Sequence, residues 1–378
     1  FKHEFIIQFF QDSLNTYNGL MSKVKGSIAI LGSGETSPNL VSVHRRLINN
    51  LNEKVNAYLI DTPFGFQENA DELVKKLKEF YQKSINIEID LASFRDKKSI
   101  NSINYFEMLE ALSDSNFIFA GPGSPSYASK TWIESGIPDL FKKHITKGGS
   151  AVFSSAAAST LGNKTLPVYE IYKVGLEPYW EKGLKILEIF NLNCTIIPHF
   201  NNKEGGTHDT SYSYVGKRRM QTLLENEFTN IIGIDEHTAL LIDGEDNSFE
   251  VEGIGKVTII NHKEEKAFEK GEVYNLDELK KLLPLSKDNV LNNKKSETKL
   301  DDISDLNEQI AKLKLQIKNE KNYSEIFNTL VEDLISLRNQ LRDNKKFEES
   351  DNIRNLLEKL NIVIEDDKES SNWSFKDL

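Results

Sequence analysis

Short runs of apolar or alternating apolar residues, most of them followed by glycine, proline or a small residue, recur along residues 27–283. The runs have the length of strands and lie at 28–31, 55–60, 85–91, 117–120 and 150–154. Between them, stretches such as 38–51 and 67–82 have the apolar spacing of amphipathic helices. Strands that alternate with helices imply an α/β fold, with a mainly parallel sheet flanked by helices on both faces. In such a fold we expect the functional groups in the loops at the carboxyl ends of the strands.

The alternation loosens after residues 195–198, which are predicted as a further strand. Residues 238–242 and 249–260 are predicted as antiparallel strands at a sheet edge, and residues 276–283 as a closing helix. The main domain is therefore predicted over residues 27–283.

The composition changes after residue 283. Residues 284–304 are rich in Lys, Asn, Ser and Asp and poor in large apolar groups, which is typical of a linker. From about residue 303 to residue 360, the apolar residues recur only at helical spacings. We therefore predict a small α-helical C-terminal module over residues 305–378.

The beginning of the sequence differs from the rest of the main domain. Residue 1 is Phe, and the first methionine, Met21, stands shortly before the first predicted strand. An apolar patch at residues 5–10 lacks the basic lead and the small-residue cleavage site of a secretory signal. We expect translation to start at Met21 and residues 1–26 to be an N-terminal extension.

Charge and cysteine content limit the class of protein. A net charge of −11 argues against a general binder of nucleic acids or anionic membranes, because such proteins use basic faces. No stretch approaches the roughly 20 apolar residues that a membrane helix needs. Cys194 is the only cysteine, so no internal disulfide can form, which fits a cytoplasmic protein.

A predicted strand is followed by a run of small residues within 148–159, where the sequence is Gly-Gly-Ser-Ala-Val-Phe-Ser-Ser-Ala-Ala-Ala-Ser. A nucleophile elbow needs such a run, because its sharp strand-to-helix turn leaves no room for large neighbouring side chains. The usual elbow pattern is Gly-x-Ser-x-Gly, and Phe153 and Ala157 stand at its two glycine positions. The alternative interpretation is an ordinary helix start with Ser154 as N-cap.

This segment resembles the elbow of the peptidase E and cyanophycinase family, and the resemblance aligns Ser155 with the nucleophile. Four other segments, two before the elbow and two after it, stand in the family's order along the chain: Ile30–Glu35 as its opening strand and turn, Phe119–Ser124 as its oxyanion loop, Ile197–Phe200 as its histidine segment, and Gly233–Ala239 as its Gly-Ile-Asp-Glu strand. The resemblance covers residues 27–262. It implies the class I glutamine amidotransferase-like, flavodoxin-like fold and serine hydrolase activity.

The resemblance also implies a catalytic set. A serine hydroxyl needs a general base, and His199 is the candidate because it follows a predicted strand. A carboxylate should orient that base. Glu170, which follows the elbow, is preferred, and Glu236 in the Gly-Ile-Asp-Glu segment is the alternative. Without the resemblance, a lone histidine or carboxylate would be interpreted as a surface or structural group.

Two further sets of groups complete the predicted site. The oxyanion is expected to bind the backbone N–H of Ala156 and that of Gly123 or Ser124. Arg218 and Arg219 stand where the family carries arginines; they would fix a substrate carboxylate or simply line an exposed helix.

No cofactor or metal is expected. His208 beside Asp209, and His237 beside Glu236, match no common spacing of metal ligands. The segment Gly32-Ser33-Gly34 lacks the rest of a dinucleotide fingerprint.

Residues 330–373 carry a second resemblance, to the C-terminal end of cysteinyl-tRNA synthetases, which lies in the anticodon-binding region. The matching segments are 334–342, 347–354, 361–366 and Trp373. Residues 301–378 hold 18 acidic but only 12 basic residues, whereas phosphate contacts need clustered cations. A packing or assembly module, with homo-oligomers as one outcome, is the alternative to tRNA binding.

Three functions therefore compete. The first is a serine peptidase or amidohydrolase that acts on a small peptide or isopeptide. The second is a binding protein on the same fold, and the third is a tRNA-associated protein. Substrate specificity depends on loop residues that follow no general sequence pattern, so the sequence does not identify the substrate.

Overall fold

A computed structural model describes residues 23–285 except 52 and 101, and then 323–343, 346–359, 362–366 and 371–375. The chain divides into two compact units, Phe1–Val290 and Leu291–Leu378. The expected start at Met21 and most of the predicted linker 284–304 lie outside the described residues, and the predicted domain boundaries stay predictions.

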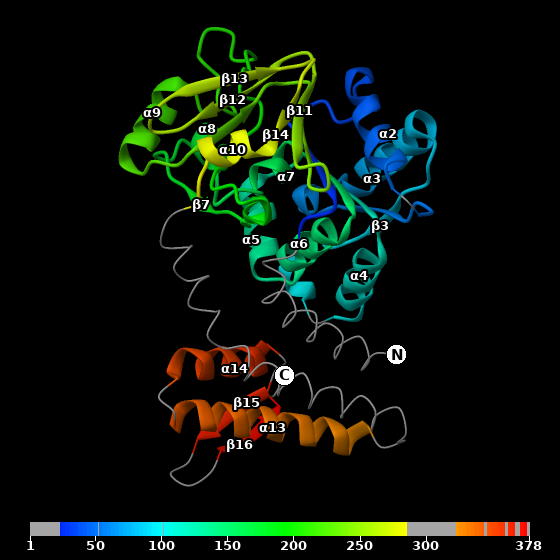
Figure 1. The fold of residues 1–378 in the computed structure, drawn as a ribbon, viewed down its shortest axis with the longest axis vertical. Helices are drawn as coiled ribbons and strands as arrows, with labels where there is room; N and C mark the ends of the chain where they lie inside the picture. Colours follow the sequence, from blue (N-terminus) through cyan, green and yellow to red (C-terminus); the bar gives the residue numbers. More distant parts are fainter. Residues whose placement is uncertain are drawn as a thin grey trace. The chain divides into compact units, whose positions relative to one another are not determined.

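The first unit is built on an eight-stranded sheet with the order β14-β11-β10-β1-β5-β4-β2-β3 (Figure 1). Five strands run parallel, namely β1 (Ser27–Leu31), β5 (Ser150–Ser154), β4 (Phe117–Ala120), β2 (Ala57–Ile60) and β3 (Asp90–Ala92). Three antiparallel strands extend the sheet beyond β1, namely β10 (Thr238–Asp243), β11 (Ser248–Gly253) and β14 (Val273–Asn275). The predicted α/β class with a mainly parallel sheet is confirmed.

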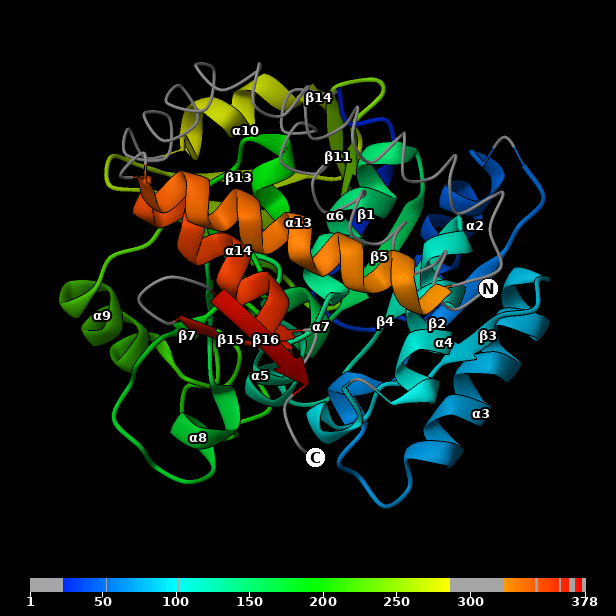
Figure 2. The same cartoon turned by 90° about the horizontal axis from the view of Figure 1, so that it is seen from below.

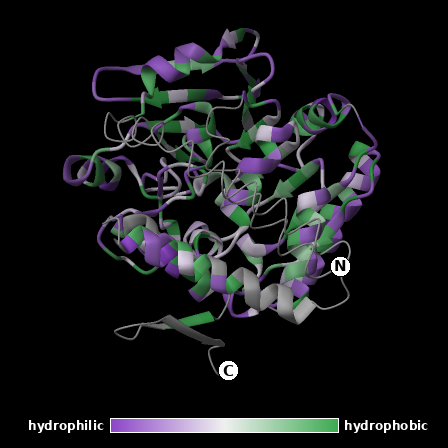
Figure 3. Ribbon diagram, turned by 60° about the horizontal axis from the view of Figure 1, so that its bottom comes forward, coloured by the Kyte–Doolittle hydropathy of each residue, from purple (hydrophilic) through white to green (hydrophobic). Residues whose placement is uncertain are grey.

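Helices cover both faces of this sheet because successive side chains of each strand point to opposite faces. Along β1, Ile28 and Ile30 join one apolar cluster, and Ala29 and Leu31 join another. Residues of α4 (Ile103–Asp114), α5 (Pro125–Ile133) and α6 (Ile137–Lys147) pack into the first cluster, and those of α2 (Val41–Asn49) and α3 (Ala70–Phe80) pack into the second. Figure 2 shows these helices around the strands, and Figure 3 shows hydrophilic and hydrophobic residues alternating along them.

A second sheet of four strands was not predicted. Its order is β13 (Glu265–Glu269), β12 (Lys256–Ile260), β9 (Ile231–Ile234) and β8 (Thr195–Ile197). Only β8 and β9 are parallel to each other. The stretch predicted as strand over 249–260 is split by a turn at Ile254 and Gly255, so that β11 and β12 belong to different sheets.

The predicted strand 85–91 is largely wrong. Helix α3 continues as a π-helical turn, Tyr81–Ile85, which ends at Asn86 in the left-handed region with φ 68°. Tyr81 and Ile85 are buried, so packing favours one more helical turn there. The alternating isoleucines at 85, 87 and 89 imitate a strand, and β3 begins only at Asp90.

The first unit also contains the helices α7 (Ala156–Ser159), α8 (Val168–Tyr172), α9 (Lys217–Asn226) and α10 (Leu276–Leu282). The last of these matches the predicted closing helix. None of the helices in the described part of the chain is long and apolar enough to cross a membrane.

The second unit contains helices α13 (Tyr323–Asp343) and α14 (Phe347–Lys359), followed by a hairpin of β15 (Ile362–Asp366) and β16 (Ser371–Phe375). Val331, Ile335, Leu357, Ile362 and Ile364 form its apolar core. The helices were predicted, but the hairpin was not, because β15 and β16 are short strands that lie beyond the last helical repeat.

Candidate active site

Ser155 lies in the turn between β5, in the middle of the main sheet, and the short helix α7 (Ala156–Ser159). Its backbone has φ 52° and ψ −112°, a sparsely populated conformation for a residue with a Cβ. The Ser155 N–H donates to the Leu31 carbonyl oxygen over 3.0 Å. Only alanines follow at 156–158, and all three are buried, so the sharp turn is not obstructed.

The two departures from the elbow glycines are accommodated. Phe153 is fully buried, and its ring packs edge-on against Phe141 with a centroid distance of 5.1 Å. The large side chain thus lies in the core. Ala157 is also fully buried, and its N–H donates to the Gly121 carbonyl oxygen over 3.3 Å.

His199 follows β8 and lies against Ser155. Its Nε2 is 2.8 Å from Ser155 Oγ, and its Nδ1 is 3.0 Å from Glu236 Oε1. An ionised carboxylate only accepts hydrogen bonds, so Nδ1 carries the proton and donates it to Glu236. Nε2 is then free to accept from the Ser155 hydroxyl. The three side chains form one continuous chain of hydrogen bonds.

Glu236 is held as a carboxylate. The hydrogen bond from His199, together with one from Asn202 Nδ2 at 2.7 Å, keeps the pKa of Glu236 below its usual value. The group is therefore ionised at neutral pH, as the orientation of the histidine requires.

The geometry places Glu236, the alternative in the sequence analysis, and not the preferred Glu170, beside the histidine. Glu170 lies on α8, and its Oε1 accepts from Ser126 Oγ over 2.5 Å at the start of α5. Glu236 reaches His199 because β8 and β9 are parallel neighbours, with Ile197 opposite Gly233. The residues just beyond the ends of these two strands therefore meet.

The loop between β4 and α5 lies next to the elbow, since β4 pairs with β5. The Ser124 N–H donates to the Pro63 carbonyl oxygen over 2.8 Å, so it is not free for an oxyanion. The N–H groups of Gly123 and Ala156 donate to no acceptor in the described part of the chain. Of the backbone N–H groups predicted to bind the oxyanion, those of Ala156 and Gly123 are therefore the two that the structure leaves as candidates.

The sequence model of Peptidase family S51 matches residues 28–249. The chain belongs to this family. It is therefore a serine peptidase, and a hydrolase by class. The second unit lies outside the matched residues, so its similarity to synthetase ends stays a prediction.

Two solved structures are similar to this S51 peptidase. A peptidase from an acI-B1 Actinobacterium is 24% identical with a TM-score of 0.55, and the match covers 67% of this chain and 98% of the other. A candidate peptidase E protein from Listeria monocytogenes EGD-e is 14% identical with a TM-score of 0.42, over 61% of this chain and 100% of the other. A comparison with curated proteins found no match.

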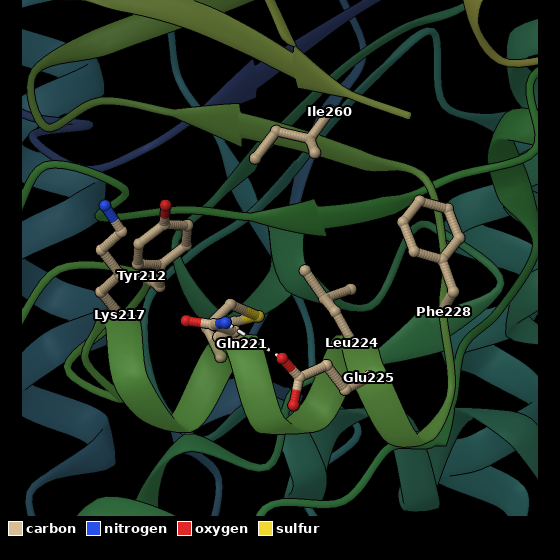
Figure 4. Close-up of a pocket in the computed structure, with 8 residues that line it drawn as sticks. Tyr212, Lys217, Gln221, Leu224, Glu225, Phe228 and Ile260 are labelled. Carbon is tan, nitrogen blue, oxygen red and sulfur yellow. Dashed lines mark hydrogen bonds between the residues drawn. The ribbon is translucent and has the colours of Figure 1, made fainter. Parts of the chain in front are cut away.

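Arg218 and Arg219 lie at the start of α9 in the S51 domain, and both side chains are exposed. Arg219 Nη1 donates only a long bond, 3.5 Å, to the Val215 carbonyl oxygen. Their placement is that of an exposed helix face. A recess of about 330 Å³ between α9 and β12 is lined by Tyr212, Lys217, Met220, Gln221, Leu224, Glu225, Phe228 and Ile260 (Figure 4). Ser155, His199 and Glu236 do not line this recess.

Sequence reasoning missed Tyr214, whose ring centroid lies 5.6 Å from that of His199. It ends a run of three left-handed residues, Tyr212, Ser213 and Tyr214, with φ between 56° and 67°. The Ser213 N–H donates to the His199 carbonyl oxygen over 3.2 Å, which ties this strained run to the histidine. No motif signalled it.

Proposed function

We propose that this S51 peptidase hydrolyses a small peptide or isopeptide with Ser155 as nucleophile, His199 as general base and Glu236 as the carboxylate that orients the base. The observation that carries the proposal is the hydrogen-bonded chain from Ser155 Oγ through both ring nitrogens of His199 to Glu236 Oε1.

The chemistry follows from these positions. As Ser155 Oγ attacks the carbonyl carbon of the scissile bond, its proton passes to His199 Nε2. The oxyanion that forms is stabilised by the N–H groups of Ala156 and Gly123. Glu236 stabilises the imidazolium, which then gives its proton to the leaving amine. Water, activated by His199, hydrolyses the resulting ester and regenerates Ser155.

A dipeptide and isopeptide library tests the proposal. The wild-type protein should release free amines from a subset of the library, and Ser155→Ala should release none. An active-site serine probe, such as a fluorophosphonate, should label wild type only. Absence of both turnover and labelling would favour the rival function, a binding protein on the same fold.

A further inference from the structure

One short segment at the carboxyl end of β1 bonds to the three chain segments that carry the proposed triad. The Leu31 carbonyl oxygen accepts from the Ser155 N–H over 3.0 Å, and the Gly32 carbonyl oxygen accepts from the His199 N–H over 3.2 Å. Ser33 Oγ accepts from the N–H of His237, the neighbour of Glu236, over 3.1 Å. The position of this turn therefore sets the relative positions of the three catalytic segments.

Glu35 completes this turn with a side-chain bond to the elbow. Its Oε2 accepts from the hydroxyl of Ser154, the residue directly before the nucleophile, over 2.9 Å. Ser154 is fully buried, so its hydroxyl needs a partner inside the protein. In the described part of the chain, this is the one hydrogen bond that the Glu35 carboxylate makes.

The backbone of Glu35 is fixed from the other side. His44 Nε2 is 2.9 Å from the Glu35 carbonyl oxygen, and His44 Nδ1 is 3.0 Å from the Tyr81 hydroxyl oxygen. A carbonyl oxygen only accepts, so Nε2–H donates to it and Nδ1 accepts from Tyr81. Both rings are fully buried. Burial lowers the pKa of His44 to about 4, so the ring is neutral and this arrangement persists at neutral pH.

The elbow needs such support because Ser155 is strained. A non-glycine residue with φ 52° and ψ −112° is strained and persists only where its surroundings hold it. The bonds Ser155 N–H to Leu31 and Ala157 N–H to Gly121 hold the turn through its backbone. On the strand side of the turn, the bond from Ser154 to Glu35 holds it through a side chain.

We propose that Glu35 is a positioning residue, whose carboxylate acts through the Ser154 hydroxyl to hold Ser155 Oγ in line with His199 and the scissile carbonyl. The proposal rests on the proposed function of Ser155. It assigns the first of the two adjacent serines a role of its own: Ser154 transmits the constraint, and Ser155 performs the chemistry.

The test compares Ser154→Ala, Glu35→Ala, Glu35→Gln and the double variant Glu35→Ala/Ser154→Ala in the full-length protein. Ser159→Ala is the matched control. Ser159 is a fully buried serine on helix α7, directly after the elbow, and its hydroxyl has no hydrogen-bond partner among the described residues. The measurements are kcat and KM on a hydrolysed dipeptide, the rate of labelling by a fluorophosphonate, and the thermal unfolding midpoint.

We expect Ser154→Ala and Glu35→Ala each to lower kcat and the labelling rate about tenfold with little change in KM, since one positioning hydrogen bond is lost. The double variant should be no slower than either single variant, because both remove the same bond. Glu35→Gln should keep most of the wild-type rate, because its amide oxygen can still accept from Ser154. Ser159→Ala should match wild type.

Losses that multiply in the double variant, or a Ser154→Ala rate equal to that of Ser159→Ala, would overturn the proposal. Should Glu35→Ala fail to fold, Ser154→Ala removes the same bond from its other end and decides alone. Activity that survives Ser155→Ala would instead disprove the proposed function, so the two failures are distinguishable.

Discussion

The Ser124 N–H donates to the Pro63 carbonyl oxygen, and this 2.8 Å bond joins the loop after β4 to the loop after β2. The β2 loop is itself held by Asp61, which is fully buried and accepts from the Phe94 N–H at 2.9 Å and from Arg95 Nε at 2.6 Å. This support orients the Gly121–Ser124 loop so that the Gly123 N–H, beside the elbow, has no acceptor among the described residues.

Gly123 should tolerate no side chain. Its φ is 149°, and a Cβ there would overlap the Pro63 carbonyl oxygen. Gly123→Ala should therefore displace the loop and lower kcat at least about a hundredfold, the usual cost of losing an oxyanion donor. Steady-state kinetics check this. Gly175→Ala is the control, because Gly175 also has positive φ but faces open space. Equal rates for both variants would place the oxyanion elsewhere.

Replacing Ser155 by alanine should lower the rate of hydrolysis far more than replacing Ser154. Ser155→Ala should abolish hydrolysis and labelling by a serine probe without changing the unfolding midpoint, because only the attacking oxygen is removed. Ser154→Ala should retain about a tenth of the rate, as expected for one lost hydrogen bond. If Ser154 proves essential and Ser155 dispensable, the register of the elbow is off by one residue.

Glu236 should matter more than Glu170 for turnover. Glu236→Gln would present His199 with an amide, which removes the charge that stabilises the imidazolium and permits the wrong tautomer. A loss of kcat of about 10³–10⁴ is expected by analogy with other triads. Glu170→Gln should cost far less, since Glu170 bonds Ser126 and not the histidine. The ratio of the two kcat values decides, and a larger loss at Glu170 would reverse the assignment.

Two buried histidines should make stability depend on pH. Burial lowers the pKa of His44 and of His144 from 6.5 to about 4. The unfolded chain binds these protons more readily, so stability is fully present above about pH 6.5 and is lost as pH falls toward 4. Each ring contributes about 3 kcal/mol over this range.

Denaturant unfolding at several pH values between 7.5 and 4 measures this effect. His44→Gln keeps a donor and an acceptor in the side chain but cannot titrate, so the free energy of unfolding should fall less steeply on acidification. If the free energy of unfolding of His44→Gln falls as steeply with pH as that of the wild type, His44 does not carry this pH dependence.

Strands 117–120 and 150–154 were predictable to the residue, because each is an apolar run closed by a local glycine or small-residue signal. The run of small residues at the elbow is a local signal of the same kind, but the assignment of Ser155 and His199 came from the family resemblance and not from a local pattern. The choice between Glu170 and Glu236 was not predictable, because it depends on which strands pair. The β8–β9 pairing joins residues more than thirty positions apart, and no local pattern encodes it.

The first unit should function without the second. Leu283 is fully buried, and its carbonyl oxygen accepts from the Asn193 N–H over 3.0 Å, so the first unit closes its own core at this residue. The second unit has a separate, much smaller core, and small cores are marginally stable. A chain ending at Val290 should therefore stay soluble and keep its kcat, whereas a cut before Leu283 should destabilise it. Loss of turnover in the chain ending at Val290 would make the C-terminal residues part of the catalytic unit.

The full-length chain and the chain ending at Val290 also test tRNA binding. Only the full-length chain should shift tRNA in a gel, and the shift should weaken as the salt concentration rises. No shift at low salt would leave the second unit as a packing module.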